Sequence, residues 1–299
     1  MAELDRGGQV TCYDKGLDGG AVGVNIADER QSSGDLGAGD SAGLTEETYW
    51  DSYWSSVSLP REITRRPGRL YLNAILDVFD RFVPKSSGQT VLEVGGAPGQ
   101  YLAYMHRAFG AEVHCLDYSA MGCSKAEENL ALLNIPGCVH RVDLFDPDVS
   151  LGPFDVVYSL GFIEHFSNLV PVVARHLALL KPGGLLILGA PNFLGVNRWF
   201  LSRLAPELLA KHNLLAMDVD NWAQFEDTLG LLPIWKGYVG GFEPSILDRW
   251  EGYTPSRAAL RLLIRAMRKV LTGHFSVLRR VNTKRTSGYV MGVYQKPMT

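Results

Sequence analysis

The stretch from Val91 to Gln100 constrains the fold more than any other part of the chain. Its first four residues are apolar or β-branched around one carboxylate, Glu93, and glycines follow at 95, 96 and 99. Glycine lets a turn adopt positive φ angles and approach a ligand closely, and the amides of a helix that starts there carry a partial positive charge. The stretch therefore predicts a buried parallel strand, a tight turn and a helix that together form a small-molecule cradle.

The spacing of these glycines separates two kinds of nucleotide ligand. A dinucleotide fingerprint reads G-x-G-x-x-G, which the glycines at 95, 96 and 99 match poorly. The pattern Glu93-x-Gly95-x-Ala97-x-Gly99 instead resembles the first motif of the class I S-adenosylmethionine-dependent methyltransferases, acidic-x-G-x-G-x-G, with Ala97 where the family usually has glycine. The resemblance implies S-adenosylmethionine as cofactor and a Rossmann-like α/β fold: a seven-stranded sheet with helices on both faces and an antiparallel edge hairpin.

The rest of the chain alternates predicted strands and helices, as such a fold requires. Helices are predicted over 69–82, 101–109, 119–133, 169–180, 199–212 and 222–229. Strands are predicted over 91–94, 112–117, 138–142, 154–160, 185–189, 232–239 and 287–294. The Lys-Pro-Gly-Gly sequence at 181–184 is expected to separate a helix from the fifth strand, and the last two strands pair antiparallel in the family.

Two carboxylates follow predicted strands and suit an adenosine. Asp117 ends the second strand, where it can accept hydrogen bonds from both ribose hydroxyls, although it can also simply begin a turn. Asp143 follows the third strand, where a carboxylate and apolar neighbours suit an adenine ring. Asp146 can exchange roles with Asp143, and a solvated turn is the remaining alternative there. The residues expected to bind the cofactor are Glu93, Gly95, Gly96, Ala97, Gly99, Asp117, Tyr118, Asp143, Leu144 and Ser159.

A pair of residues, Glu164 and His165, follows the fourth predicted strand. Ligands lie beyond the carboxyl ends of parallel strands, so this pair is expected to face the sulfonium centre. Family members often carry an acidic-His pair here, which makes Glu164 a candidate substrate contact and His165 a candidate catalytic base. The alternative is a histidine that packs or forms hydrogen bonds within the fold.

The N-terminal part is expected to stand apart from the main domain. Residues 1–44 are rich in Gly, Asp and Ser without periodicity, which predicts a disordered acidic leader, with an acidic flap as the alternative. Residues 45–66 begin with four aromatic side chains in six positions, among them Tyr49 and Trp54. We expect this segment to form a lid over the cofactor or a clasp on the core. The methyltransferase domain is expected over 67–299, with helical insertions at about 191–215 and 245–272.

The bulk composition excludes several classes of protein. A hydrophobic content of 46% and a net charge of -3 are those of an ordinary globular protein and argue against general nucleic-acid binding. The four cysteines form no C-x-x-C pair and no metal spacing with histidine, so reduced thiols, no metal and a cytoplasmic setting are expected. The sequence contains no apolar run long enough to span a bilayer and no signal-peptide pattern.

The segment from Ser256 to Leu271 predicts a basic amphipathic helix in a region without acidic residues. Its basic face carries Arg257, Arg261, Arg265 and Arg268. Such a helix can lie on an anionic membrane or receive a phosphorylated or lipid-linked substrate. The alternative is a solvated surface helix over a sheet edge.

The sequence therefore predicts transfer of a methyl group from S-adenosylmethionine to a small molecule or a sugar or glycan precursor, at a hydroxyl. C- or N-methylation of a secondary metabolite and a catalytically decayed cofactor-binding protein are the alternatives, and a nicotinamide-dependent oxidoreductase is disfavoured by the glycine spacing. The identity of the acceptor and the oligomeric state are not predicted.

Overall fold

A computed structural model describes residues 9–13, 43–147, 149, 151–242, 259, 262, 263, 266 and 281–298. The strands are β1 Gln9–Tyr13, β2 Thr90–Val94, β3 Glu112–Asp117, β4 Gly137–Arg141, β5 Phe154–Leu160, β6 Leu180–Pro191, β7 Pro233–Val239 and β8 Tyr289–Gln295. The α-helices are α1 Glu47–Ser55, α2 Leu70–Phe82, α3 Gln100–Phe109, α4 Ala120–Leu132, α5 Leu169–Ala178, α6 Gly195–Leu204, α7 Pro206–Ala210 and α8 Ala223–Leu229. Two short 3-10 helices are η1 Ile163–His165 and η2 Leu214–Met217.

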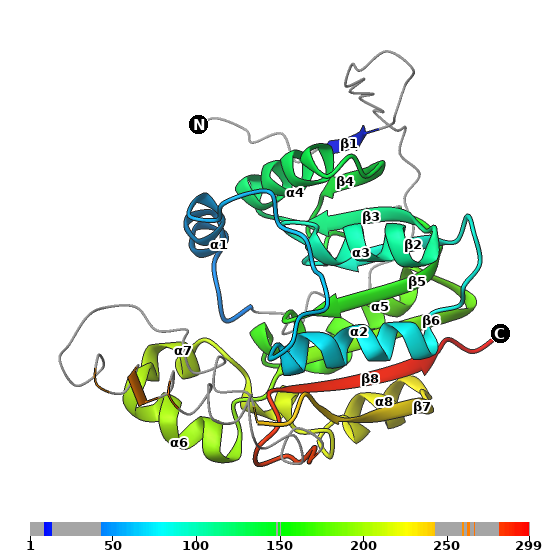
Figure 1. Cartoon of the computed structure of the whole chain (residues 1–299). Coiled ribbons are helices and arrows are strands. Elements are labelled where there is room, and N and C mark those ends of the chain that lie inside the picture. The colour runs from blue at the N-terminus through cyan, green and yellow to red at the C-terminus, as the bar shows by residue number, and fades with distance from the viewer. Residues whose placement is uncertain are drawn as a thin grey trace, which may run out of the picture.

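The described strands form one sheet in the order β1-β4-β3-β2-β5-β6-β8-β7. Neighbouring strands from β4 to β6 are parallel, whereas β8 runs antiparallel to both β6 and β7 (Figure 1). The predicted fold class is therefore confirmed, including the antiparallel hairpin at one edge. In such a sheet the carboxyl ends of the parallel strands meet at one side, where ligands bind.

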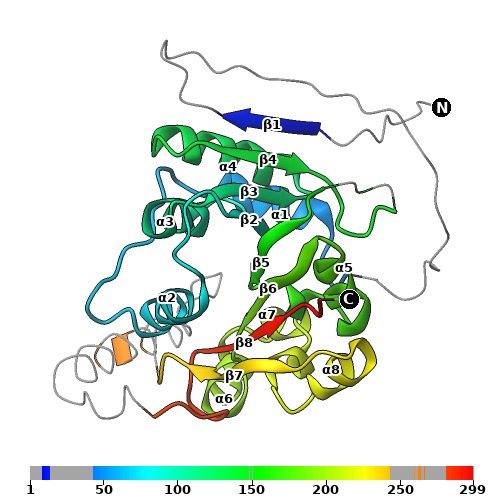
Figure 2. The same ribbon diagram turned by 90° about the vertical axis from the view of Figure 1, so that its right-hand side faces the viewer.

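Helices cover both faces of the sheet and bury two separate hydrophobic cores (Figure 2). The helices α2, α3 and α4 lie on one face, where Ile75, Phe79 and Leu102 are fully buried. On the other face lie α5 and α8, with Val172 and Phe225 fully buried. The amphipathic patterns read from the sequence place these side chains inward because burying them removes apolar surface from water.

The expectation of a leader without structure is wrong for residues 9–13. These residues form β1, which pairs antiparallel with β4 and adds an eighth strand to the predicted seven. The pairing covers backbone groups of β4 that would otherwise lie at an open sheet edge. A five-residue strand within a Gly- and Asp-rich stretch gives too short a pattern to be recognised in the sequence.

The cysteines also differ from the expectation of four reduced thiols. Cys12 on β1 and Cys138 on β4 are directly opposite in the strand pairing and form a disulfide. Cys115 and Cys123 are buried thiols. The disulfide joins residues 126 positions apart, a pairing that sequence spacing does not reveal.

Two element boundaries in the structure differ from those predicted from the sequence. The expected helix over 199–212 is divided into α6 and α7 because Pro206 lacks the amide that would continue α6, and it begins α7 instead. The Lys-Pro-Gly-Gly sequence at 181–184 lies within β6, which starts at Leu180 and pairs there with Phe154 across an irregularity. Both changes leave the order of the elements as predicted.

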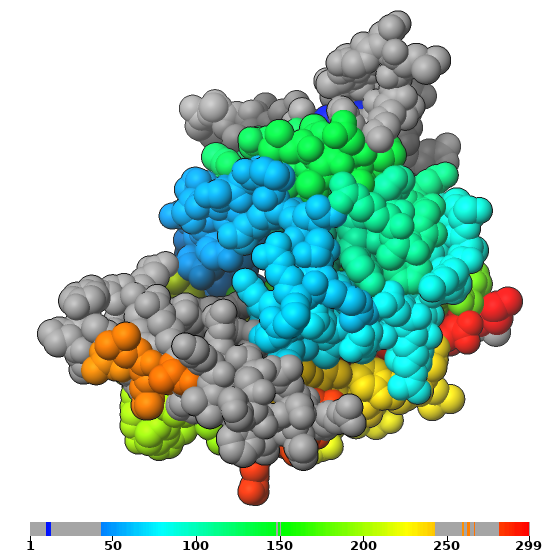
Figure 3. Space-filling model, in the orientation of Figure 1, coloured from blue at the N-terminus to red at the C-terminus, as the bar shows by residue number. Residues whose placement is uncertain are grey.

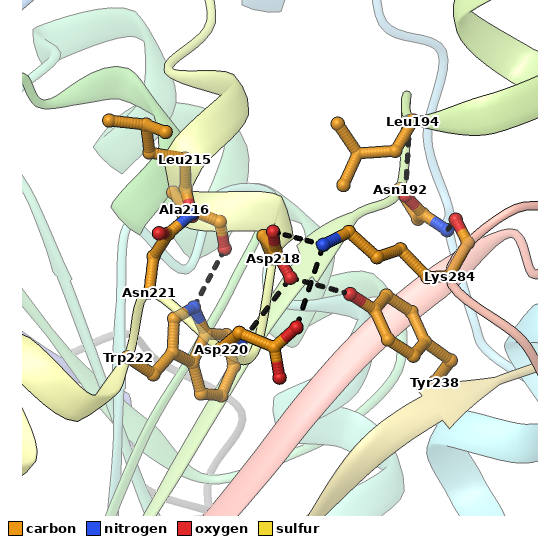
Figure 4. Close-up of polar contacts among 10 residues, drawn as sticks. All are labelled: Asn192, Leu194, Leu215, Ala216, Asp218, Asp220, Asn221, Trp222, Tyr238 and Lys284. Atoms are coloured by element: carbon orange, nitrogen blue, oxygen red, sulfur yellow. Dashed lines mark hydrogen bonds and ion pairs between the residues drawn. The ribbon is translucent and has the colours of Figure 1, made fainter.

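The segment between η1 and β7 is fixed to the β7–β8 edge by a polar cluster shown in Figure 4. Lys284 forms an ion pair with Asp218 and lies 3.6 Å from Asp220, while the Tyr238 hydroxyl donates to Asp218 at 3.2 Å. The Trp222 indole donates to the Ala216 carbonyl at 2.9 Å. The chain that follows η2 is thus anchored close to the sheet.

The predicted basic helix, with Arg257, Arg261, Arg265 and Arg268, lies outside the described residues, as does most of the 245–272 insertion. Within the described parts of the chain, none of the helices combines the length and the apolar character needed to cross a membrane.

Candidate functional site

A cavity of about 1200 Å³ lies at the carboxyl ends of the parallel strands. Its walls come from the turn after β2, the tips of β3, β4 and β5, the loop before α2, and α7. In Figure 1, α1 and α7 both lie beyond the strand tips. Figure 3 shows α1 and the chain that follows it spread over this side of the molecule between α4 and α2. The cavity is larger than the roughly 300–1,000 Å³ of a usual ligand pocket, so it has room for a cofactor and an acceptor together.

The glycine-rich turn between β2 and α3 has the conformation that its sequence requires. Gly95 has a φ of +65°, and a Cβ there would lie 2.6 Å from the Phe162 ring. A Cβ on Gly96 would lie 3.0 Å from Cys115 Sγ and from Glu93 side-chain atoms. Gly95 and Ala97 line the cavity, whereas Gly96 and Gly99 shape the turn and do not contribute to its wall. The close approaches explain why this turn needs glycine.

Asp117, at the end of β3, is buried and faces the same turn. Its two carboxylate oxygens accept hydrogen bonds from the amides of Ser119 at 3.0 Å and Ala97 at 3.4 Å. Burial raises the pKa of Asp117 to about 6, although these amide bonds act in the opposite direction. Each oxygen has further acceptor capacity toward the cavity, since a carboxylate offers about four lone-pair sites.

Glu93, the acidic residue of the first motif, is buried at the floor of the cavity. The Tyr158 hydroxyl donates to its carboxylate at 2.9 Å. Burial raises the pKa of Glu93 well above its usual range, against the effect of the Tyr158 bond, and the nearby charge of Asp117 adds to the rise. The two carboxyl groups therefore favour a cationic or hydrogen-bond-donating ligand in this half of the cavity.

The other end of the cofactor half is formed by the chain after β4. Asp143 accepts a hydrogen bond from the Phe145 amide at 2.9 Å, and Asp143, Leu144 and Phe145 all line the cavity. Asp146 is not part of this wall, so the structure favours Asp143 over Asp146 as the adenine contact. Tyr118 lies beside them on the cavity wall. This arrangement combines one carboxylate with apolar side chains, which is what an adenine ring requires.

Ser159 is a predicted cofactor residue that the structure places away from both the cavity and the glycine-rich turn. It is fully buried in β5, paired with Leu188 of β6, and does not line the cavity. Side chains alternate along a strand, so Tyr158 and Leu160 share one face of the sheet and Ser159 points to the opposite face. The residues of this strand that reach the cavity are Leu160 and the following Gly161.

Glu164 and His165 lie on η1, directly after β5, and both line the cavity. The His165 ring is edge-on to Trp50, with ring centroids 4.9 Å apart, and lies 4.6 Å from the His212 ring. Burial lowers the pKa of His165, and the charge of the neighbouring His212 acts in the same direction. Together they bring this pKa to about 3. The ring is thus neutral at pH 7 but a weak proton acceptor. His212 was not expected from the sequence, because it lies 47 residues beyond His165.

The aromatic helix α1 forms a roof over the cavity, with Tyr49, Trp50, Tyr53 and Trp54 in its lining. An unexpected residue anchors it: Asp51 accepts hydrogen bonds from the Ser119 hydroxyl at 2.6 Å and from the Met121 amide at 3.2 Å. These donors lie at the start of α4, where a carboxylate is favoured by the exposed amides and the helix dipole. The segment described as a lid or a clasp thus lines the cavity and is also tied to the core.

Basic side chains line the part of the cavity wall that is formed by segments outside the strand tips. They are Arg61, Arg66 and Arg69 from the segment before α2, and Lys211 after α7. The Lys211 ammonium lies 3.9 Å from the centroid of the Tyr49 ring. The cavity therefore combines an acidic half at the strand tips with a half that carries cationic groups.

Comparison with known proteins agrees with this geometry. The family model described as a methyltransferase domain matches residues 65–228, more than half of the chain. The chain therefore belongs to this methyltransferase domain family, and the resemblance read from its first motif is confirmed. No curated protein sequence matches the chain with significance.

Several solved structures are similar to the chain at low sequence identity. A structure of geranyl diphosphate C-methyltransferase from Streptomyces coelicolor, in complex with Mg²⁺, geranyl-S-thiolodiphosphate and S-adenosylhomocysteine, has a TM-score of 0.54 at 14% identity, covering 84% of this chain and 97% of that chain. The cyclase SpnF has a TM-score of 0.57 at 14% identity, covering 87% and 98%. Phosphoethanolamine N-methyltransferase 2 from Haemonchus contortus, with S-adenosylmethionine, has a TM-score of 0.47 at 18% identity, covering 74% of this chain. The chain spans about half the length of that enzyme, 52%.

The residues at the strand tips fit S-adenosylmethionine. The turn at Gly95 and Gly96 packs tightly against Phe162, Cys115 and Glu93, Asp117 offers acceptors beside it, and Asp143 with Leu144 forms an apolar slot with one carboxylate. Glu93 adds a further carboxyl group at the cavity floor. This donor and acceptor set suits an adenosine with an attached cationic amino acid.

Proposed function

We propose that this protein transfers a methyl group from S-adenosylmethionine to a small-molecule acceptor, most directly to a hydroxyl group of a sugar or glycan precursor. The observation that carries the proposal is the position of Asp117 beside the glycine-rich turn, at the mouth of a cavity large enough for two ligands. The bound cofactor supplies an electrophilic methyl group.

The role of the chain's own residues is to bind and orient the two molecules. Asp117 holds the ribose and Asp143 the adenine, while the backbone of the turn at Gly95 lies against the bound cofactor. The acceptor then lies between η1, α1 and α7, in line with the methyl group. Alignment of two reactants within one site can supply much of the rate enhancement, because the entropy of bringing them together is lost on binding. The oxygen–carbon bond forms as the carbon–sulfur bond breaks, and the hydroxyl proton leaves to solvent or to a base.

His165 is the predicted base, and its position supports contact with the acceptor because it lines the cavity beside Glu164. Its surroundings do not favour proton transfer, since a pKa of about 3 makes the neutral ring a weak acceptor at pH 7. A base role for His165 thus stays a prediction that geometry alone supports.

The cationic half of the cavity supports an acceptor that carries an acidic group. Arg61 and Arg69 are exposed and line the cavity, as does Lys211. Guanidinium groups recognise phosphate and carboxylate groups through paired hydrogen bonds. A phosphorylated sugar or another anionic glycan precursor fits this half better than a neutral apolar molecule.

Two alternatives have support of their own. C-methylation is favoured by the C-methyltransferase among the similar structures, and N-methylation is the other chemistry that the sequence leaves open. A protein that binds the cofactor without methylating is favoured by the cyclase SpnF, which shares the fold, and by Ala97 in the first motif.

We further propose peripheral membrane contact through the basic helix predicted over 256–271. The supporting feature is the four arginines on one face of that sequence. Replacing Arg257, Arg261, Arg265 and Arg268 with glutamine should abolish cosedimentation with anionic vesicles. Equal sedimentation of the variant and the unaltered chain would remove this part of the proposal.

The test of the proposed activity uses two measurements on the purified chain. S-adenosylhomocysteine should raise the melting temperature, whereas NAD should not. The protein should then move a labelled methyl group from S-adenosylmethionine to an anionic fraction of a cell extract, and the product should be identified as an ether, amine or carbon-methylated compound. Binding without any transfer would support the non-methylating alternative, and no binding would contradict the proposal altogether.

A further inference from the structure

Three side chains at the acceptor end of the cavity come from two separate parts of the chain and converge on one point. Glu164, His165 and His212 each offer a ligand atom, and these atoms all lie within 4.8 Å of one another. Glu164 is 1% exposed and His165 is 7% exposed, so both are removed from bulk water, and all three residues line the cavity. This convergence is not visible in the sequence, where only Glu164 and His165 are adjacent.

The local structure holds the three groups together. The Asn213 amide donates to the Glu164 carbonyl at 2.6 Å, and the Asn213 side chain donates to the Phe166 carbonyl at 2.9 Å. These bonds clamp the residue after His212 to both sides of His165. The polar cluster of Figure 4, through Asp218 and Lys284, fixes the chain that follows η2. The positions of the three side chains therefore depend on rigid backbone contacts.

The hydrogen bonds of the histidines prepare them as ligands. His212 Nδ1 lies 2.6 Å from the Leu208 carbonyl, so Nδ1 carries the proton and Nε2 carries the lone pair. A backbone carbonyl that fixes the second nitrogen in this way is the usual partner of a metal-bound histidine. His165 Nδ1 is buried and has no hydrogen-bond partner among the described residues. A buried polar atom of this kind costs free energy unless a ligand satisfies it.

We propose that Glu164, His165 and His212 bind a divalent transition-metal ion at the acceptor end of the cavity. Two imidazoles and one carboxylate are a ligand set that suits first-row transition metals and leaves coordination positions open. An ion about 2.1 Å from each ligand would bring the three atoms to within roughly 3–3.5 Å of one another, so binding needs only small side-chain movements. The ammonium group of Lys211, the residue before His212, lies over the Tyr49 ring.

The open positions face the cavity, where the acceptor is expected. A divalent ion there would hold an acceptor oxygen in place and lower the pKa of its hydroxyl group. This role in methyl transfer rests on the proposed function, whereas binding of the ion does not. The ligand class that follows is an acceptor with a hydroxyl next to a second oxygen donor.

The proposal is tested with Co²⁺ alone added to the full-length chain after removal of metals by chelation. The unaltered chain should bind one equivalent with visible absorption bands, and Glu164→Gln, His165→Gln and His212→Gln should each weaken binding at least tenfold. The matched controls are Glu207→Gln, a carboxylate in the same cavity, and His106→Gln, a histidine on α3 outside it; both should bind as the unaltered chain does. The proposal would be overturned if the unaltered chain showed no saturable Co²⁺ binding. It would also be overturned if the Glu164→Gln and His212→Gln variants bound Co²⁺ as tightly as the unaltered chain does.

Two further readouts keep the result independent of folding and of the proposed activity. Pulsed electron paramagnetic resonance of the Cu²⁺-loaded unaltered chain should show couplings to two imidazole nitrogens, and a spectrum without them would overturn the assignment even if the variants misfold. S-adenosylhomocysteine affinity is measured in parallel on the same samples. Metal binding without cofactor binding would contradict the proposed function, and cofactor binding without metal binding would contradict this inference.

Discussion

The two halves of the cavity are built in different ways. The cofactor half is made by the tips of adjacent strands, where Gly95, Asp117 and Asp143 each follow or end a strand directly. The acceptor half combines segments that are far apart in the chain: α1, the loop before α2, η1 and the end of α7. The first half is thus a property of the sheet, whereas the second depends on contacts between insertions.

This difference indicates which contacts are fixed by the sheet, namely those to the cofactor, and which can vary to set the choice of acceptor. Strand tips are held by backbone hydrogen bonds on both sides, so the cofactor contacts have little freedom. Insertions outside the sheet can change without disturbing it, and functional variety is usually placed there. Changes in the cofactor half should therefore affect cofactor affinity strongly, and changes in the acceptor half should affect it weakly.

The largest expected effect is at the glycine-rich turn. Gly95→Ala places a Cβ 2.6 Å from the Phe162 ring at a φ of +65°, and we expect a loss of about 2–5 kcal/mol in unfolding free energy together with loss of S-adenosylhomocysteine binding. Gly230→Ala is the matched control, because its φ is +64° with nothing within 4 Å; it should cost only about 1–2 kcal/mol. Chemical denaturation and calorimetry measure both. Similar results for the two variants would show that the turn is not a tight cradle.

The next effect concerns the ribose contact. Asp117→Ala should weaken S-adenosylhomocysteine binding by about 1–3 kcal/mol, since the hydroxyl groups lose their buried acceptor. Glu112→Ala, at the exposed start of the same strand, should leave the affinity unchanged. Isothermal calorimetry of the two variants makes the comparison. Unchanged affinity for Asp117→Ala would remove the ribose role.

The raised pKa of Asp117 predicts how cofactor affinity depends on pH. The free carboxyl group, with a pKa of about 6, takes up a proton as the pH falls below that value and then accepts fewer hydrogen bonds. Affinity for S-adenosylhomocysteine should therefore be constant above pH 7 and fall by about tenfold toward pH 5. In Asp117→Asn this fall should vanish. A fall of equal size in the Asn variant would assign the titration to another group.

The smallest expected effect is at the anchor of the roof. Asp51→Asn weakens the bonds from the Ser119 hydroxyl and the Met121 amide, so α1 should open more often. We expect faster hydrogen exchange over residues 47–55 and a loss of about 0.5–1.5 kcal/mol in cofactor affinity. Ser52→Ala, exposed on the same helix, is the control. Unchanged exchange in Asp51→Asn would show that other contacts hold α1 in place.

The cofactor half could be predicted largely from the sequence, for a physical reason. A strand, a turn and a helix are encoded within ten residues, and Asp117 or Asp143 needs only a strand end to be placed. Ser159 shows the limit of this method: it lies near the end of a strand, yet the alternation of side chains directs it away from the cavity. Being close to a strand tip in sequence does not decide which face a side chain takes.

The acceptor half could not be predicted in this way because its neighbours are distant in sequence. His212 reaches Glu164 only through the break at Pro206 and the clamp of Asn213. Asp51 contacts Ser119 across 68 residues. The strand β1 and its disulfide to Cys138 likewise depend on a partner more than a hundred residues away. Local patterns carry no signal for such contacts.

The most direct test of the account is a crystal structure of the chain with S-adenosylhomocysteine. The account predicts ribose hydroxyls within hydrogen-bonding distance of the Asp117 carboxylate, the adenine beside Asp143 and Leu144, and the sulfur directed toward Glu164 and His165. A ligand bound elsewhere, or strand tips filled by side chains in the presence of saturating ligand, would contradict it.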